Sequence, residues 1–212
     1  MSIQKKFAAP ALPTATPEYE DRLIDKITSV LRLYFTQVDN FLLQLSGNYG
    51  GASLGFPCGY FYDTTTQSAA AATVTVITIN STGLSNYVSL SGGSQIVVTK
   101  AGYYNVQFSI QGANTAAAVD NMTVWFRKNG TDVANSAGVI GVPAKHGAIN
   151  GALVFSWNQF FQLAANDYLQ LCWTTDGGTS SITTYAASGV APIHPAAPGV
   201  IITVQYVSAV PS

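Results

Sequence analysis

Residues with the types and spacing that catalysis or metal binding requires are scarce in this chain. Its two histidines, His146 and His194, belong to no HExxH-like motif and to no cluster with cysteine. The carboxylates beyond residue 46 lack the paired spacing expected of a glycoside hydrolase; they are Asp63, Asp120, Asp132, Asp167 and Asp176. We therefore expect a protein that is not an enzyme and holds no metal and no cofactor. Because folding can bring distant aspartates together, a glycan-cleaving activity stays open as the least favoured alternative.

The two cysteines are too few to form a disulfide framework. Cys58 and Cys172 each lie in an apolar, strand-like run, where a buried thiol is the usual state. We expect two free thiols, and a bridge between them remains the less favoured alternative.

The first element that the sequence predicts is a helix over residues 17–46. Thr16 and Pro17 supply an N-cap and a proline at the first helical position, and Ser46-Gly47 interrupts the pattern at the other end. Between them, apolar residues recur at alternating spacings of three and four, which is typical of a helix that packs against identical partners. The predicted oligomerisation seam consists of Ile24, Ile27, Leu31, Tyr34, Val38, Phe41 and Leu45.

Apolar residues also occur outside this seam, at Leu33, Phe35, Leu42 and Leu43. A helix that is apolar nearly all round is normally buried. Because three heptads are the lower limit for a coiled coil, a helix that folds back on its own β-rich body is an open alternative.

The remaining boundaries follow from composition. Residues 1–16 are rich in proline and alanine and predict an extended attachment arm, and residues 47–57 predict a linker. The N-terminus has no secretory signal pattern, and Arg32 and Asp39 interrupt the longest apolar stretch. We expect folding in a cytoplasm and no insertion into a membrane.

Residues 58–212 predict a mainly β head. Eight candidate strands are separated by turn residues, and two of them show apolar and polar residues in alternation: Val74 and Val76 in residues 72–80, and Tyr104 to Ile110 in residues 103–111. The candidate strand over residues 148–163 is long enough to bend near Trp157. Eight strands of this kind predict a sandwich or barrel.

Charge is distributed unevenly along the 212 residues. Ten of the charged residues precede residue 46 and nine follow it, although charged residues make up about a quarter of a typical soluble domain. Such a neutral body either buries much of its surface against neighbours or displays an uncharged polar surface. The net charge of −1 offers no basic field for phosphates, so we expect no nucleic-acid partner.

The order of three motifs carries a family resemblance. Residues 101–110 (AGYYNVQFSI), 124–130 (VWFRKNG) and 163–171 (LAANDYLQL) resemble strands and a hairpin of complement-head and tumour-necrosis-factor-like jelly rolls. That family forms compact trimers, many of them on a collagen stalk, which is absent from this sequence. A proline-rich arm, a helix containing residues 31–42 and such a head together resemble the fibre or spike proteins of tailed phages, particularly marine ones.

The resemblance implies a virion structural protein: a homotrimer made in the host cytoplasm that docks on a capsid, portal or tail through residues 1–45. Its head loops would contact a host surface glycan or protein; the candidate receptor-loop residues are Lys145, His146, Asp176, Tyr185 and His194. A decoration protein that stabilises the particle without touching the host is the alternative.

Overall fold

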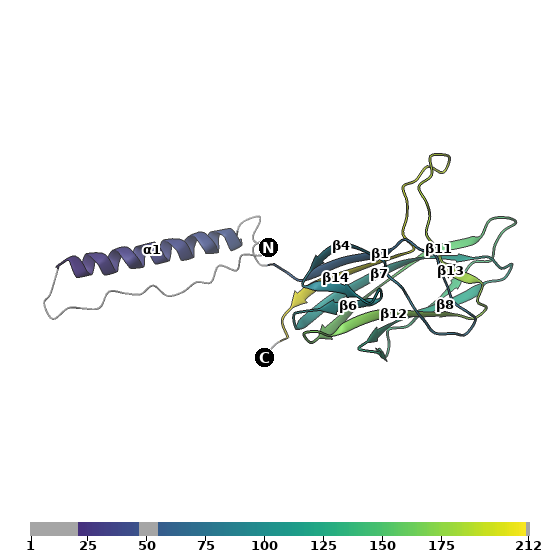
Figure 1. Ribbon diagram of the computed structural model, residues 1–212, viewed down its shortest axis with the longest axis horizontal. Helices are drawn as coiled ribbons and strands as arrows, with labels where there is room; N and C mark the ends of the chain where they lie inside the picture. Colours follow the sequence, from purple (N-terminus) through teal and green to yellow (C-terminus); the bar gives the residue numbers. More distant parts are fainter. Residues whose placement is uncertain (1–20, 47–54, 211–212) are drawn as a thin grey trace. The chain divides into compact units, whose positions relative to one another are not determined.

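The computed structural model of the chain describes residues 21–46 and 55–210, which belong to two units divided between Phe56 and Pro57. The first unit contains helix α1 (Asp21–Ser46) and the second contains the strands (Figure 1). The predicted arm over residues 1–16, the predicted helix start at Pro17 and residues 47–54 of the predicted linker lie outside the described residues.

No side chain between Leu23 and Leu45 of α1 is fully buried. Ile24 is 51% exposed, and the other predicted seam residues, from Ile27 to Leu45, are half-buried. Outside the seam, Leu33 is 62% exposed and Phe35 is 58% exposed, so the helix is apolar on more than one face, as the sequence indicates. Association of the seam with other copies, and the alternative of packing on the head, both remain predictions.

The second unit, which we call the head, is an antiparallel β-sandwich. Its strands are β1 (Cys58–Asp63), β2 (Gln67–Ser68), β3 (Thr75–Val76), β4 (Ser81–Asn86), β5 (Val88–Ser91), β6 (Gln95–Val98), β7 (Gly102–Asn114), β8 (Asp120–Lys128), β9 (Thr131–Asp132), β10 (Gly138–Val142), β11 (Gly151–Leu163), β12 (Tyr168–Thr175), β13 (Ser180–Ile182) and β14 (Val200–Ser208). The first sheet contains β11, β7, β14, β1 and β4, with β13 and β2 beside one end of β7. The second sheet contains β10, β8, β12, β6 and β5, with β3 and β9 at its margins.

The order of strand pairing defines a jelly roll. Among the eight principal strands, the first pairs with the last, β1 with β14, and the second pairs with the seventh, β6 with β12. Likewise β7 pairs with β11 and β8 with β10. An antiparallel ribbon rolled into two sheets produces this pattern. The predicted fold class, an N-terminal helix followed by a jelly-roll sandwich, is therefore confirmed.

The core lies between the two sheets. In β7 the alternation read from the sequence is confirmed, because Tyr104, Val106, Phe108 and Ile110 are all at most 1% exposed. Phe108 of one sheet meets Phe126 of the other edge to face, with ring centroids 5.4 Å apart. Such pairs add specific geometry to the burial of apolar surface.

The alternation predicted over residues 72–80 is wrong. Only Thr75 and Val76 form a strand, Val74 is 53% exposed, and the buried residues are Ile77 and Ile79. The segment passes along β12 rather than pairing with it throughout: the Ile77 amide donates to Leu171 O, whereas the Ile79 amide donates to Gly93 O. Its Val-Thr pattern therefore does not mark the buried face.

Three further differences concern strand boundaries. Strand β11 begins at Gly151 and pairs with β7 without interruption to Leu163, so it is not split near Trp157. Strands β4, β5 and β10 were not predicted. Both cysteines are free. Cys172 is buried, as expected, and this burial raises the pKa of its thiol. Cys58 is only half-buried.

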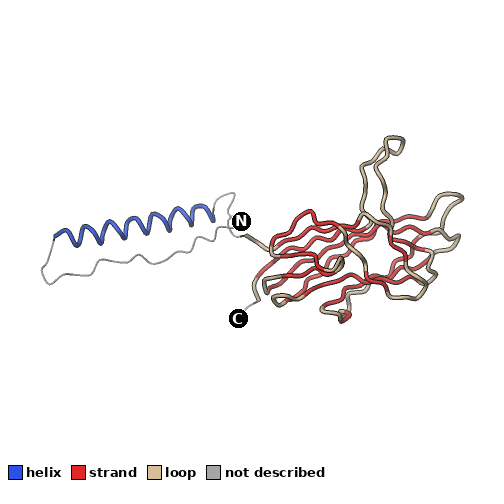
Figure 2. Tube along the Cα trace, viewed as in Figure 1, coloured by secondary structure: helices blue, strands red, loops and turns tan. Residues whose placement is uncertain are grey.

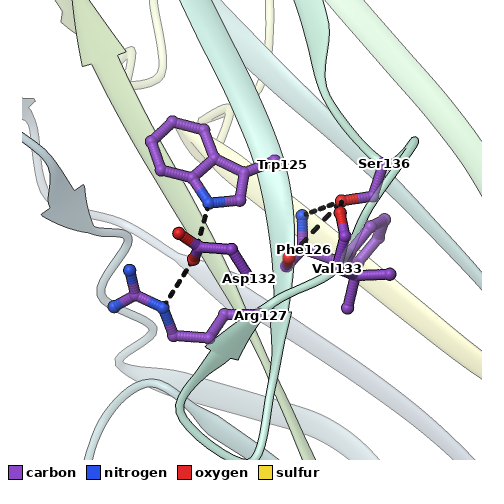
Figure 3. Close-up of polar contacts among 6 residues, drawn as sticks. All are labelled: Trp125, Phe126, Arg127, Asp132, Val133 and Ser136. Atoms are coloured by element: carbon purple, nitrogen blue, oxygen red, sulfur yellow. Dashed lines mark hydrogen bonds and ion pairs between the residues drawn. The ribbon is translucent and has the colours of Figure 1, made fainter.

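Strands β8 and β9 form a tight hairpin whose turn is set by the sequence. Asn129 and Gly130 both adopt positive φ, 49° and 83°, as a two-residue hairpin turn requires. The Asp132 carboxylate accepts hydrogen bonds from Arg127 Nε (2.8 Å) and Trp125 Nε1 (2.9 Å), as Figure 3 shows. Both bonds lower the pKa of Asp132, and the bond from Arg127 has the larger effect.

The segment after β9 is held by the buried Ser136. Its hydroxyl oxygen accepts a hydrogen bond from the Phe126 amide at 3.0 Å and lies 2.8 Å from Val133 O, to which it donates (Figure 3). Ser136 is 1% exposed, so no water replaces these bonds when the hydroxyl is removed.

We predict that Ser136→Ala lowers the free energy of unfolding by about 1–3 kcal/mol, because the buried Phe126 amide loses its acceptor. Denaturant unfolding followed by circular dichroism, at fixed protein concentration, measures this change. Ser89→Ala, at an exposed position of β5, is the matched control and should change stability by less than about 0.5 kcal/mol. Equal stability of the two variants would contradict the role assigned to Ser136.

Candidate functional site

The head has two distinct ends. At one end the chain enters, where the Tyr206 amide of β14 donates to Pro57 O at 2.9 Å. At the opposite end lie the connections β7–β8 (residues 115–119), β10–β11 (residues 143–150) and β12–β13 (residues 176–179). We call these three loops the tip.

Asn114, a fully buried residue at the end of β7, joins the loops of the tip. Its Nδ2 donates to Ala118 O at 2.8 Å and to Val142 O at 3.3 Å. Its Oδ1 accepts from the Ala116 amide at 2.9 Å and lies 2.9 Å from the Thr179 hydroxyl. One side chain therefore contacts all three connections or the strands that bear them.

Asp120, at the start of β8, shapes the β12–β13 turn. Its Oδ1 accepts from the Gly177 amide at 2.7 Å, and its Oδ2 accepts from the amides of Ser180 (2.8 Å) and Thr179 (3.1 Å). Burial by itself would raise the pKa of this carboxyl, but the donors from Gly177, Ser180 and Thr179 outweigh it and hold the pKa below its usual range. Asp120 is thus an ionised, 4% exposed anchor for the turn.

Three of the predicted receptor-loop residues lie in the tip. Lys145 and His146 are exposed in the β10–β11 loop, where the Lys145 amide donates to Ala116 O at 2.8 Å. Asp176 is exposed in the β12–β13 turn, and its Oδ2 accepts from Asn121 Nδ2 at 2.8 Å. The structure brings their loops together, although no hydrogen bond or ion pair joins these three side chains.

The other two predicted residues lie in a separate projection, residues 183–199, which we call the finger. Figure 2 shows it as a long loop that stands off from the strands of the sandwich. Tyr185 and Ala197 exchange two backbone hydrogen bonds of 2.9 Å, and Ser188 exchanges a further pair with His194. The rings of Tyr185 and His194 meet edge to face, with centroids 6.5 Å apart. Paired backbone hydrogen bonds therefore join the two arms of the finger.

A groove of about 480 Å³ lies between the base of the finger and β1. Tyr60 and Tyr62 of β1 line it on one side, and Thr184, Tyr185 and Pro198 line it on the other. Because Phe61 and Asp63 alternate with the two tyrosines and are buried, Tyr60 and Tyr62 face away from the core.

The sequence analysis did not identify the residues that arrange the tip or those that line the groove. Asn114 and Asp120 contact residues up to 65 positions away, so no local pattern marks them. Tyr60 and Tyr62 are spaced by two residues in a predicted strand, which places them on one face, but nothing local brings Tyr185 beside them.

The described residues show no conventional catalytic or metal arrangement. Within residues 21–46 and 55–210, no group of three or more His, Cys, Asp or Glu side chains is placed to hold a metal ion. His146 and His194 lie in different loops, one in the tip and one in the finger. Over the same described ranges, no helix has the length and hydropathy required to span a bilayer.

No protein-family model matches the chain, and no protein of curated function matches it. Among solved structures, the chain is similar to Eiger TNF from S. frugiperda, with a TM-score of 0.48, 11% sequence identity, and coverage of 74% of this chain and 96% of that chain. The jelly-roll assignment rests on the strand pairings described above.

We predict that Asp120→Asn lowers the free energy of unfolding at pH 7 by about 1–3 kcal/mol, because three backbone amides lose an ionised acceptor. The pKa of Asp120 is lower in the folded chain, so its contribution is present above the ordinary pKa of about 3.9 and is lost as the pH falls through the folded value. Melting temperatures between pH 7 and pH 3 measure both effects.

The variant should lose stability less steeply than the natural chain as the pH falls below about 4. Asp176→Asn, which alters an exposed carboxylate of the same turn, serves as the control and should keep the acid dependence of the natural chain. Parallel pH profiles for the natural chain and Asp120→Asn would show that Asp120 does not anchor the turn through its charge.

Proposed function

We propose that this chain is a virion structural protein, a homotrimeric fibre or spike of a tailed phage. Residues 1–45 attach it to other virion proteins, and the head displays its loops for contact with a host surface glycan or protein. The protein acts by binding and carries out no reaction.

The observation that carries this proposal is an exposed apolar strip on one margin of the head. Within residues 55–210, β11 forms hydrogen bonds of the sheet with β7 alone, so its other edge is open. Val154 (69% exposed) and Phe160 (63%) lie on the outward face of this strand, and Trp157 (42%) lies on the opposite face at the open edge. A long, apolar, open edge strand favours pairing with other chains, and a closed ring of three copies covers it without leaving a free end.

Composition supports the same assembly. Only nine charged residues follow residue 45 in the sequence, so little charge opposes close packing of heads. The apolar strip and the predicted seam of α1, from Ile24 to Leu45, provide two separate surfaces for association. The resemblance to trimeric jelly-roll heads agrees with a threefold arrangement.

The geometry of the head suits display. The tip lies at the end of the sandwich opposite Pro57, where the chain enters. Loops at that end, including Lys145, His146 and Asp176, are the part of the head farthest from its point of attachment, where a recognition surface is most useful. Three copies would add weak contacts by avidity.

We predict that light scattering gives the mass of three chains for the intact protein and for a truncated chain beginning at Gly47. Phe160→Asp should shift the truncated chain to the mass of one, because a carboxylate would have to be buried at the contact. Ile149→Asp, at a 74% exposed residue of the tip, is the matched control and should remain trimeric.

Circular dichroism shows whether the monomeric variant keeps its β structure. A natural chain that stays single at high concentration would refute the proposed assembly. A trimer that persists in Phe160→Asp would exclude the β11 strip as its contact surface.

Binding to host cells separates display from particle stabilisation. We predict that the intact trimer binds cells of a susceptible strain, and that the double variant Lys145→Ala, Asp176→Ala reduces this binding at least tenfold without changing the mass. Absence of binding to any strain, together with fragile particles when the protein is missing, would instead favour the decoration role.

A further inference from the structure

The groove at the base of the finger has features that the proposed assembly does not require. Its lining contains tyrosine, threonine, alanine and proline side chains and no charged group. Its volume of about 480 Å³ falls within the range of about 300–1,000 Å³ that is typical of small-ligand sites. An uncharged lining with aromatic and hydroxyl groups suits an uncharged ligand that has both apolar and polar faces.

The floor of the groove is an aromatic platform. The rings of Tyr60 and Tyr62 lie side by side, with centroids 5.5 Å apart and planes inclined by 32°. Tyr60 rests on Gly83 of β4, where a register shift between β1 and β4 interrupts the regular pairing. A Cβ at Gly83 would collide with the Tyr60 ring. Glycine at this position therefore allows the ring to pack directly against the backbone of β4. The platform therefore presents ring surface to the groove.

The opposite wall is rigidly placed. Tyr185 is fixed by its two backbone hydrogen bonds to Ala197, and Gln111 Nε2 of β7 donates to Pro198 O at 2.7 Å. The ring of His194 supports Tyr185 edge to face. Tyr185 is held in this position by backbone and ring contacts and is nevertheless 37% exposed. Such preorganisation reduces the entropic cost of binding.

Unused hydrogen-bonding capacity surrounds this platform. None of the three phenol hydroxyls, those of Tyr60, Tyr62 and Tyr185, has a hydrogen-bond partner within residues 55–210. The Thr64 hydroxyl accepts from Asn80 Nδ2 and keeps its proton for an acceptor, whereas the Thr184 hydroxyl donates to Ala197 O and can still accept. Donors and acceptors are thus both available at the rim.

We propose that this groove binds a neutral saccharide. The C–H face of a sugar ring packs on the tyrosine platform, and the sugar hydroxyls bond to the phenol and threonine hydroxyls at the rim. The inference rests on the proposed display function and names the ligand class of one of its surfaces. It assigns Tyr60 and Tyr62, together with Tyr185, to recognition.

The test uses the full chain and saturation-transfer NMR with neutral oligosaccharides of glucose, galactose, mannose and xylose, and with sulfated and uronic-acid oligosaccharides for comparison. We expect at least one neutral probe to bind, with saturation of its ring C–H protons. Its affinity should be the same in 50 mM and 500 mM salt, because no charged side chain lines the groove.

Tyr185→Ala and Tyr62→Ala should each weaken binding of that probe at least tenfold while the mass of the protein is unchanged. Tyr87→Ala is the matched control, because Tyr87 is also 37% exposed but lies in the connection between β4 and β5, outside the groove. This variant should bind as the natural chain does.

Three results would overturn the inference: no neutral probe binds at millimolar concentration, only charged probes bind, or the groove variants bind as well as Tyr87→Ala. A fall in mass on Tyr185→Ala would also overturn it, by making the groove a contact between subunits. A trimer that binds host cells through the tip but binds no neutral saccharide would leave the proposed function standing and reject the groove alone.

Discussion

Strand β7 is the constraint on which the rest of the head depends. It is hydrogen-bonded along its whole length to β11 on one side, and to β14 and β13 on the other. Its inward side chains, from Tyr104 to Ile110, meet the second sheet through the contact of Phe108 with Phe126. Its last residue, Asn114, bonds to the loops of the tip, and another residue of the same strand, Gln111, bonds to Pro198 at the base of the finger. The core, the tip and the finger therefore all make contacts with this one strand.

The parts of the fold that follow from local periodicity were predictable. The alternation of β7 was predicted correctly because a strand buried on one face repeats every two residues, and the helix over 21–46 was predicted because apolar residues recur every three or four. Strand β10 was missed because Gly138-Val-Ile-Gly-Val is short and contains two glycines, which are depleted in strands.

The candidate site was harder to predict from the sequence, because its geometry depends on contacts between residues that are far apart in the chain. Turn chemistry placed Lys145, His146 and Asp176 in loops, but their convergence follows from Asn114 and Asp120, whose long-range bonds span 28 to 65 positions. In the same way, Tyr60 lies flat because strand pairing brings Gly83 beneath it. Contacts of this kind are set by topology and leave no local pattern.

The tip separates the residues that determine loop shape from those that face outward. Asn114 and Asp120 are buried and bond mainly to backbone atoms of the loops. These backbone groups remain when a loop residue is replaced by any residue other than proline. Exposed neighbours such as Val119 and Ile149 contribute little to the core, being 62% and 74% accessible to solvent. Substitutions can therefore accumulate on the outside of these loops at small energetic cost, and the head can diversify its surface while the scaffold stays the same.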